Sequence, residues 1–165
     1  MRWLPCQNRF MGDILIRPAT WHDLPHILHH RRAMFAEIGC QDEQLLDGMQ
    51  TAAEQYMRVA LPNGTYRAWM AEGDGSQVVG GGGIAIVPWP GSPDFPATRR
   101  GWILGVYTEP AFRKQGVARR IMEAIVEWCR AEGFAYVSLH ASRDGRPLYD
   151  GLGFRPTNEM RLYLK

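Results

Sequence analysis

The chain has 165 residues and a formal net charge of +2; 45% of its residues are hydrophobic and 22% are charged. These values are typical of one globular domain that is large enough to bury a sizeable core. So mild a charge does not argue for nucleic-acid binding, and we expect any preference for anions to be local.

Cysteine usage and hydropathy exclude several further classes. The three cysteines, Cys6, Cys40 and Cys129, are odd in number and far apart, which favours neither a disulfide framework nor a metal site. We therefore expect reduced thiols in the cytoplasm. No apolar run is long enough to cross a bilayer, and the start lacks the apolar stretch of a signal peptide. Residues 1–12 differ in composition from the rest of the chain, so we expect a loose N-terminal extension before a single domain over residues 13–165.

The first half of the chain predicts a strand, two helices and a hairpin. Residues 13–20 alternate as a strand does, and apolar spacing predicts helices over residues 24–38 and about 43–60. Thr20 and Asp23 resemble a capping box at the start of the first helix. Strands over residues 65–72 and 77–87 flank the turn sequence GDGS, which favours a hairpin.

The second half alternates strands and helices. A proline-rich loop precedes a strand with the apolar content of a sheet centre, and a helix with apolar spacing then ends before Gly133. The order of elements predicts a mixed sheet with helices on both faces. The expected elements are a loop (88–101), a strand (102–108), a helix (to 132), a strand (135–141), a short helix (145–154) and a last strand (159–165).

Residues 112–120, FRKQGVARR, place four cations around Gly116 at the start of the third helix. A helix N-terminus carries partial positive charge and unpaired N–H groups, so it favours an anion rather than cations. A loop, a glycine and a helix after a strand form an anion site, and Gly116 lets the backbone approach the ligand. We expect a diphosphate there, with charge-assisted bonds from Arg113, Lys114, Arg119 and Arg120.

Other phosphate-binding patterns do not fit. The chain has no Gly-x-x-x-x-Gly-Lys-Ser/Thr run. Gly80–Gly83 lie inside a predicted strand with no helix after them, so they predict a bulge or a close backbone approach rather than a dinucleotide fingerprint. A solvated basic turn without a ligand, and a nucleic-acid-binding patch, stay as alternatives; acidic residues near the patch, Glu109, Glu123 and Glu127, speak against the second.

These residues carry a resemblance to a known family. The run from Arg113 to Ala118 resembles the Arg/Gln-x-x-Gly-x-Gly/Ala motif of the GNAT acyltransferase superfamily, and ILGVYTEP resembles its central strand. PLYDGLGF, residues 147–154, resembles its C-terminal signature, with tyrosine four residues before Gly-Phe. The element order is similar from about residue 13 to 165. The resemblance implies a mixed, mostly antiparallel sheet with splayed central strands and helices on both faces.

The resemblance also implies acetyl-coenzyme A (acetyl-CoA) as cosubstrate and no metal. Amides near Gly116 would hold its diphosphate, the central strand would pair with its pantetheine arm, and a phenol would protonate the departing thiol. Tyr149 takes this catalytic role by resemblance; as an alternative it is a core aromatic residue. The cofactor-binding residues carried over are Val106, Tyr107, Thr108, Arg113, Lys114, Gln115, Gly116, Val117, Ala118, Arg119 and Ser142.

Two positions depart from the family pattern. Many relatives have asparagine where this chain has Gly105 and Ser142, so the fine positioning of substrate is in doubt there. No general base stands out: Glu37, Glu72, Glu109 and His140 are candidates by location only, and a water chain is an alternative. Histidines on the first helix have i,i+4 spacing, but no carboxylate or cysteine completes a metal set.

The expected function is an acetyl-CoA-dependent N-acetyltransferase that acts on a primary amine of a small molecule or a protein, without nucleic-acid or membrane partners. A non-catalytic module that senses acyl-CoA is the alternative. The two helices at 24–38 and 43–60 and the proline-rich loop are expected to form the acceptor pocket, with Trp69, Trp89 and Phe95 as candidate lining residues. The acceptor, the acyl group and the oligomeric state stay open, although a homodimer is common among relatives.

Overall fold

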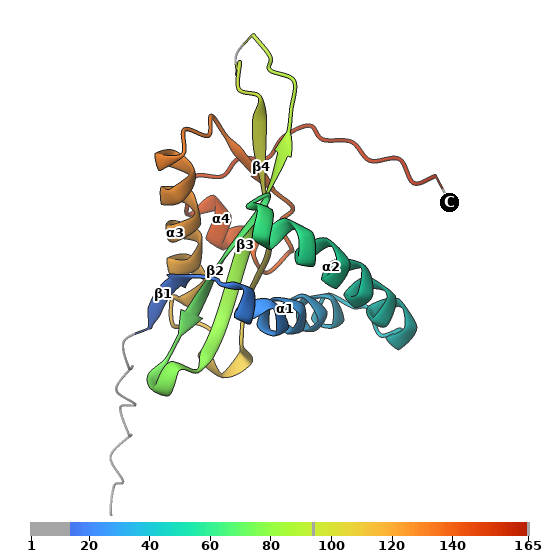
Figure 1. Cartoon of the computed structure of the whole chain (residues 1–165), viewed down its shortest axis with the longest axis vertical. Helices are drawn as coiled ribbons and strands as arrows, with labels where there is room; N and C mark the ends of the chain where they lie inside the picture. Colours follow the sequence, from blue (N-terminus) through green and yellow to red (C-terminus); the bar gives the residue numbers. More distant parts are fainter. Residues whose placement is uncertain (1–13, 94, 165) are drawn as a thin grey trace, which may run out of the picture.

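A five-stranded sheet in the order β1-β2-β3-β4-β5 forms the centre of the molecule in a computed structural model that describes residues 14–93 and 95–164 (Figure 1). The first four strands are antiparallel neighbours, and β5 is parallel to β4. The predicted fold class, a mixed and mostly antiparallel sheet with helices, is therefore confirmed. The predicted N-terminal extension lies outside the described residues.

The elements follow the predicted order up to the last helix. The strands are β1 (Leu15–Pro18), β2 (Tyr66–Glu72), β3 (Val78–Pro88), β4 (Arg99–Thr108) and β5 (Val137–Leu139). The helices are α1 (Leu24–Glu37), α2 (Glu43–Asn63), α3 (Val117–Ala131) and α4 (Arg146–Asp150), with 3-10 turns η1 (Trp21–Asp23), η2 (Asp74–Ser76) and η3 (Pro110–Phe112).

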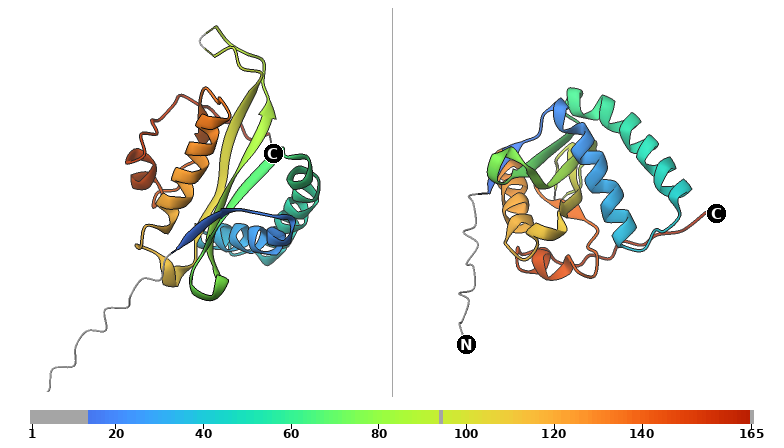
Figure 2. Two further views of the ribbon diagram at one scale, coloured as in Figure 1. Left: turned by 60° about the vertical axis from the view of Figure 1, so that its left-hand side comes forward. Right: turned by 90° about the horizontal axis from the view of Figure 1, so that it is seen from below.

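The helices cover both faces of the sheet. Figure 2 shows α1 and α2 on one face and α3 with α4 on the other. Each face has its own buried cluster because alternate residues of a strand point to opposite sides. Ile103 of β4 packs toward α3 with Ile121 and Ile125, whereas Tyr66 and Met70 of β2 pack toward the first two helices.

A buried ion-pair network fixes the start of α1 against the sheet. The predicted capping box is present: Thr20 accepts from the His22 amide, and Asp23 accepts from the Thr20 amide at 2.7 Å. Arg17 of β1 donates to both oxygens of Asp23 at 2.8 Å and to Glu72 of β2 at 2.7 Å. The bonds from Arg17 hold the pKa of Asp23 at about 2, so this carboxylate stays charged.

The hairpin between β3 and β4 is longer than predicted. Pro88 pairs with Arg99, so β4 begins at Arg99 and the proline-rich loop is confined to residues 89–98. Figure 1 shows this hairpin end projecting beyond the helices.

Strands β4 and β5 pair over a short distance and then part. Their ladder joins Gly101, Trp102 and Ile103 to Val137, Ser138 and Leu139 and ends there. The side of β4 that faces β5 is therefore open from Leu104 to Thr108 among the described residues. This is the predicted splay of the central strands.

The prediction of a last strand over residues 159–165 is wrong for the part that the structure describes. Residues 159–164 are in no strand, and Met160, Leu162 and Leu164 are 94%, 81% and 87% exposed. A strand needs a neighbour for its N–H and C=O groups, and this segment runs away from the sheet (Figure 1). Alternating apolar residues alone could not supply that neighbour.

Candidate active site

A bulge shapes β4 where it leaves β5. Gly83 pairs with Leu104 and Gly81 with Tyr107, so β4 has one residue more than β3 between these pairs. Gly105 lies in the extra stretch with φ +68°, a conformation that glycine adopts without a side-chain clash. The predicted irregularity at Gly80–Gly83 is confirmed, because a Cβ at Gly80 would lie 2.7 Å from the Tyr107 carbonyl oxygen. The bulge redirects the backbone of Val106 and Tyr107 beside the open edge.

The N-terminus of α3 follows β4 after a connection over residues 109–116, which includes η3, and it has no side-chain cap. Gly116 is the N-cap residue with φ +79°, and Lys114 also has a positive φ of +60°. The first backbone bond into the helix is from the Arg120 amide to the Gly116 carbonyl at 3.1 Å. A Cβ at Gly116 would meet nothing within 4 Å. Open space therefore lies over the first N–H groups of α3, which include those of Val117 and Ala118.

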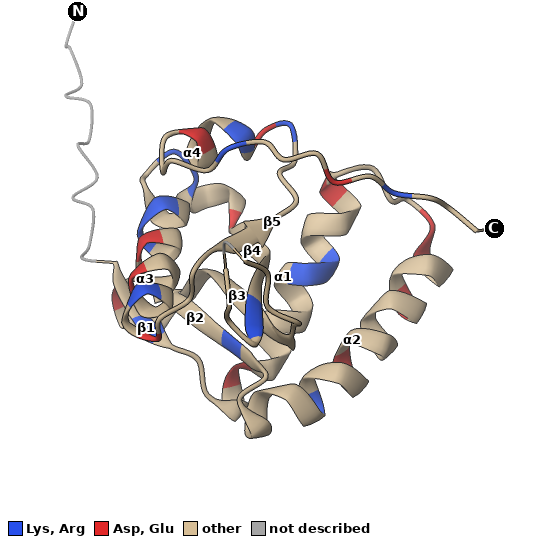
Figure 3. Ribbon diagram, turned by 90° about the horizontal axis from the view of Figure 1, so that it is seen from above, with Lys and Arg blue, Asp and Glu red and all other residues tan. Residues whose placement is uncertain are grey.

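The basic side chains around Gly116 do not all share this space. Arg119 lies 3.7 Å from Glu123 on the next turn of α3, and Gln115 donates to the Ala111 carbonyl at 3.1 Å. For Lys114 and Arg120, no ion pair with a described residue is present. Along α3, Arg119 and Arg120 lie in the first turn, Glu123 and Glu127 follow them, and Arg130 lies in the last turn, so basic and acidic side chains both line this helix (Figure 3).

Arg113 connects α1 to the end of β4. Its guanidinium donates to both Glu37 oxygens at 2.7 and 2.8 Å and to the Thr108 carbonyl at 2.9 Å, and it lies over the Tyr107 ring. The Tyr107 hydroxyl donates to the same Glu37 at 3.1 Å. Arg113 thus pairs with Glu37 in this structure, and its predicted phosphate contact stays a prediction.

Tyr149 and Ser142 lie together at α4. The Ser142 hydroxyl accepts from the Gly145 amide at 3.1 Å and so closes the turn before α4. The Tyr149 ring packs edge-on against Phe154, and a Cβ at Gly145 would lie 3.0 Å from it. Burial raises the pKa of Tyr149, so its hydroxyl stays protonated at neutral pH and can act as a proton donor.

His30, which the sequence interpretation considered only as part of the i,i+4 histidine spacing on the first helix, is a buried polar residue. It is 2% exposed, and its ring lies 5.3 Å from that of Tyr107. Burial, and then the neighbouring His29 and His26, lower the pKa of His30 to about 4, so the imidazole is neutral at pH 7. Its position three residues after Ile27, on the same helical face, was the available signal.

Each candidate base has a partner. Glu37 binds Arg113, and Glu72 binds Arg17. Glu109 Oε1 lies 2.9 Å from His29 Nε2 and 3.6 Å from His30 Nε2. His140 lies 2.9 Å from Glu159, so none of these side chains is free to be assigned as a base from geometry.

The aromatic residues proposed for the acceptor pocket are dispersed. Trp69 is buried in the cluster on the α3 face, against Trp128. Phe95 packs on Tyr136 at a ring distance of 5.0 Å, while Trp89 stacks under Arg100. These three rings therefore do not come together in one pocket.

Neither a metal cluster nor a membrane span is found in the part of the chain that the structure describes. No group of three His, Cys, Asp or Glu side chains there could hold an ion. None of the helices within residues 14–164 is both long and apolar enough to cross a bilayer.

Comparison with known proteins identifies the family. The family model described as "Acetyltransferase (GNAT) family" matches residues 26–154. No curated protein matches the chain. Among solved structures, a GCN5-related N-acetyltransferase from Ralstonia eutropha JMP134 is 33% identical, with a TM-score of 0.86 over 92% of this chain and 99% of that one.

Two further solved structures are also similar to this chain. A predicted acetyltransferase with acetyl-CoA from Clostridium acetobutylicum is 25% identical, with a TM-score of 0.84 over 92% of this chain and 97% of that one. An aminoglycoside N-acetyltransferase in complex with CoA, AAC(6')-Iy, is 18% identical with a TM-score of 0.67 over 93% and 95%, and it shows the fold alone. By the family model that matches residues 26–154 and by its likeness to the 33% identical structure, the chain belongs to the GNAT family of acetyltransferases.

Proposed function

We propose that this protein is an acetyl-CoA-dependent N-acetyltransferase that transfers the acetyl group directly to a primary amine of a small molecule or a protein. The observation that carries the proposal is the uncapped start of α3 at Gly116, in the connection that follows the part of β4 left open by β5. The similar Clostridium acetobutylicum structure with acetyl-CoA supports the same ligand.

The cosubstrate fits along the open edge of β4 and over α3. Amides from Lys114 to Arg119 hold the diphosphate, because helix N-termini and glycine turns favour anions. Val106, Tyr107 and Thr108 offer backbone groups to the pantetheine arm as a short added strand. Ser142 still has its O–H free to donate toward the arm, since its oxygen accepts from Gly145. Lys114, Arg119 and Arg120 supply the cationic bonds, and Arg113 pairs with Glu37 in this structure.

The chemistry is one acyl transfer. The amine nitrogen attacks the thioester carbonyl carbon, the C–N bond forms, and the C–S bond breaks as the thiolate leaves. The Tyr149 hydroxyl gives its proton to that sulfur, a role that suits a phenol whose pKa is raised by burial. General acid catalysis of this kind contributes about 10²–10⁴-fold. The nitrogen loses its proton to solvent water, because every candidate carboxylate has a protein partner, and solvent returns a proton to the Tyr149 phenolate.

A cytoplasmic location and a homodimer are part of the proposal. Three dispersed cysteines suit a reducing compartment, and Cys40 and Cys129 are free thiols. The exposed apolar side chains near the C-terminus support self-association.

A two-stage measurement tests the function. Calorimetry should detect acetyl-CoA binding, and a screen of diverse amines should find one that releases free thiol. Tyr149→Phe should lower turnover by about 10²–10⁴-fold without weakening cosubstrate binding. Tyr136→Phe, a tyrosine that packs against Phe95 instead, is the control and should keep full turnover.

Two results separate the alternatives. If acetyl-CoA binds but no amine in the screen is acetylated, the chain is an acyl-CoA sensor rather than an enzyme. If the wild-type protein neither binds acetyl-CoA nor releases thiol, both the acetyltransferase proposal and the sensor alternative are wrong.

A further inference from the structure

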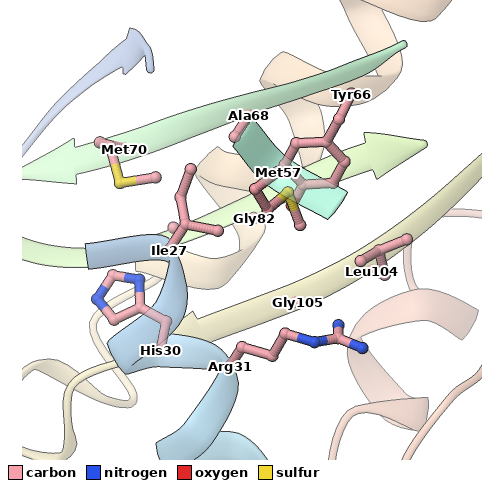
Figure 4. A pocket seen from close by; sticks show the side chains of 11 residues that line it. Ile27, His30, Arg31, Met57, Tyr66, Ala68, Met70, Gly82, Leu104 and Gly105 are labelled. Carbon is pink, nitrogen blue, oxygen red and sulfur yellow. The ribbon is translucent and has the colours of Figure 1, made fainter. Parts of the chain in front are cut away.

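A narrow pocket lies between α1 and the bulge of β4 on the acceptor-facing side of the sheet (Figure 4). Its wall is mostly apolar, with side chains such as Ile27, Met57 and Leu104. Three polar side chains also reach it: His30, Arg31 and Tyr66. The enclosed part of the pocket has a volume of about 10 Å³, room for about one water molecule, so a ligand would contact these polar groups from the mouth of the pocket.

Arg31 is the cation in this pocket. In Figure 4 its side chain leaves α1 beside Gly105 and extends along β4 toward Leu104. Its Nε is buried without a hydrogen-bond partner among the described residues. A guanidinium presents its donors in a rigid fork, and a buried donor without an acceptor is unfavourable. An acceptor oxygen at this position would therefore stabilise the Arg31 guanidinium.

The neighbouring arginine on α1, Arg32, does have carboxylate partners. Arg32 forms ion pairs with Glu43 and with Asp47, the latter at 2.8 Å, and it also donates to Gln50. No ion pair joins Arg31 to any carboxylate in residues 14–93 or 95–164. Two adjacent arginines thus differ: one is saturated by the protein, and the other faces the pocket with open donors.

The Tyr66 hydroxyl adds a second polar group. Tyr66 is 2% exposed, and burial raises the pKa of its hydroxyl, which therefore stays a neutral donor. β3 accommodates the ring because position 83 is glycine: a Cβ there would overlap the Tyr66 hydroxyl. The same oxygen would lie 3.9 Å from a Cβ at Gly105, so it sits beside the bulge.

A further arginine makes this face of β4 positive. Arg100 precedes Leu104 by four residues and lies on the same side of the strand. Its guanidinium stacks on Trp89 at 4.2 Å and on Trp102 at 4.8 Å, and its Nε is likewise buried without a described partner. The acceptor-facing surface therefore disfavours a polycationic amine.

We propose that the acceptor carries an anionic group, a carboxylate or a phosphate, which binds Arg31 at the mouth of the pocket beside Gly105 with a further bond from the Tyr66 hydroxyl. This inference rests on the proposed function and narrows its acceptor class. Arginine pairs with carboxylate and phosphate through parallel hydrogen bonds, so the anion would hold the amine in a fixed orientation.

Matched pairs of amines test the proposal. Glycine is compared with glycinamide, and phosphoethanolamine with ethanolamine, so each pair differs in the anion and the two arms separate carboxylate from phosphate. Larger amino acids and their amides extend the first arm. The wild-type enzyme should use the anionic member of at least one series at least tenfold better in kcat/KM. Arg31→Met should remove this preference mainly through KM, and Arg31→Lys should keep part of it.

Arg32→Met is the matched control, because it removes an adjacent guanidinium that already has carboxylate partners. It should retain the preference, and thermal unfolding should show that both methionine variants are folded. Equal use of charged and neutral amines, or a preference that survives Arg31→Met, overturns the proposal while leaving the acetyltransferase function intact. If no amine is acetylated, calorimetry with the same pairs decides: anion binding that is lost in Arg31→Met supports the pocket, and its absence in the wild type refutes it.

Discussion

His30 is a titratable side chain in a helix position that faces the core. Because burial lowers its pKa from 6.5 to about 4, the folded protein binds fewer protons than the unfolded chain between these values. The free energy of unfolding therefore keeps its full value with respect to His30 above about pH 6.5, and it decreases as the pH falls toward 4. Each pH unit in this window changes the free energy of unfolding by at most about 1.4 kcal/mol. We therefore expect the protein to weaken steadily from pH 6.5 to pH 5.

Urea unfolding at pH 7.5, 6 and 5 measures this dependence. His30→Gln removes the titrating group, so its free energy of unfolding should vary less with pH than that of the wild type. His22→Gln removes an exposed imidazole and should leave the dependence unchanged. Asp23, with a pKa of about 2, stays ionised throughout and does not contribute. Identical pH dependence in the wild type and His30→Gln would contradict the buried neutral state.

At this scale the sequence shows which residue types are present but not which partners they have. Gly116 could be singled out because a strand, a glycine and a helix have local rules. The pairing of Arg113 with Glu37 could not, since the two residues are 76 positions apart. The contrast between Arg31 and Arg32 is likewise invisible in the sequence, where the two are adjacent and identical.

Helix α3 has a glycine with a positive φ at each end. Alanine substitutions at the two positions can therefore separate an effect on anion binding from the effect of backbone strain. Gly116 has φ +79° and Gly133 has φ +75°, and a Cβ at either would meet nothing within 4 Å. Alanine at either position should cost about 1–2 kcal/mol of stability, because L-residues disfavour this conformation. Only Gly116→Ala should also weaken acetyl-CoA binding, since only that Cβ enters the space over the first amides.

Chemical denaturation and calorimetry on the two variants give both quantities. The expected result is a similar loss of stability in Gly116→Ala and Gly133→Ala, with at least a tenfold weaker affinity for acetyl-CoA in the first alone. If both variants bind acetyl-CoA as the wild type does, the diphosphate does not lie over Gly116.

Elements with strong local signals were predicted well, and elements that need a partner were not. The capping box and apolar spacing gave the start of α1, and the turn residues gave the hairpin of β2 and β3. The predicted strand over residues 135–141 shortens to Val137–Leu139, because only these residues pair with β4. Alternation in residues 159–165 indicated a strand but not whether a neighbour exists.

The outer edge of strand β5 lacks a strand neighbour among the described residues, and the apolar segment at residues 160–164 is exposed. β5 pairs with β4 on one side only, and no strand of the described chain covers its other side. A groove of about 450 Å³ lies there, lined by β5 and by residues 154–157 among others. The segment that leads away from this edge, residues 160–164, exposes Met160, Leu162, Tyr163 and Leu164 (Figure 1). An open strand edge and an exposed extended segment are complementary between two copies of one chain.

We expect the protein to form a dimer in which residues 160–164 of each copy lie along β5 of the other. Burial of these apolar side chains and pairing of the free backbone groups would favour it. Sedimentation velocity from 1 to 100 µM should show a dimer for the wild type, while the double variant Leu162→Asp and Leu164→Asp should be a monomer. Val59→Asp, which charges an equally apolar exposed position on α2, is the control and should stay dimeric. A wild-type chain that is monomeric over this range, or a dimer that survives the double substitution, contradicts the arrangement, and a monomer would indicate that the segment stays exposed or folds against its own β5.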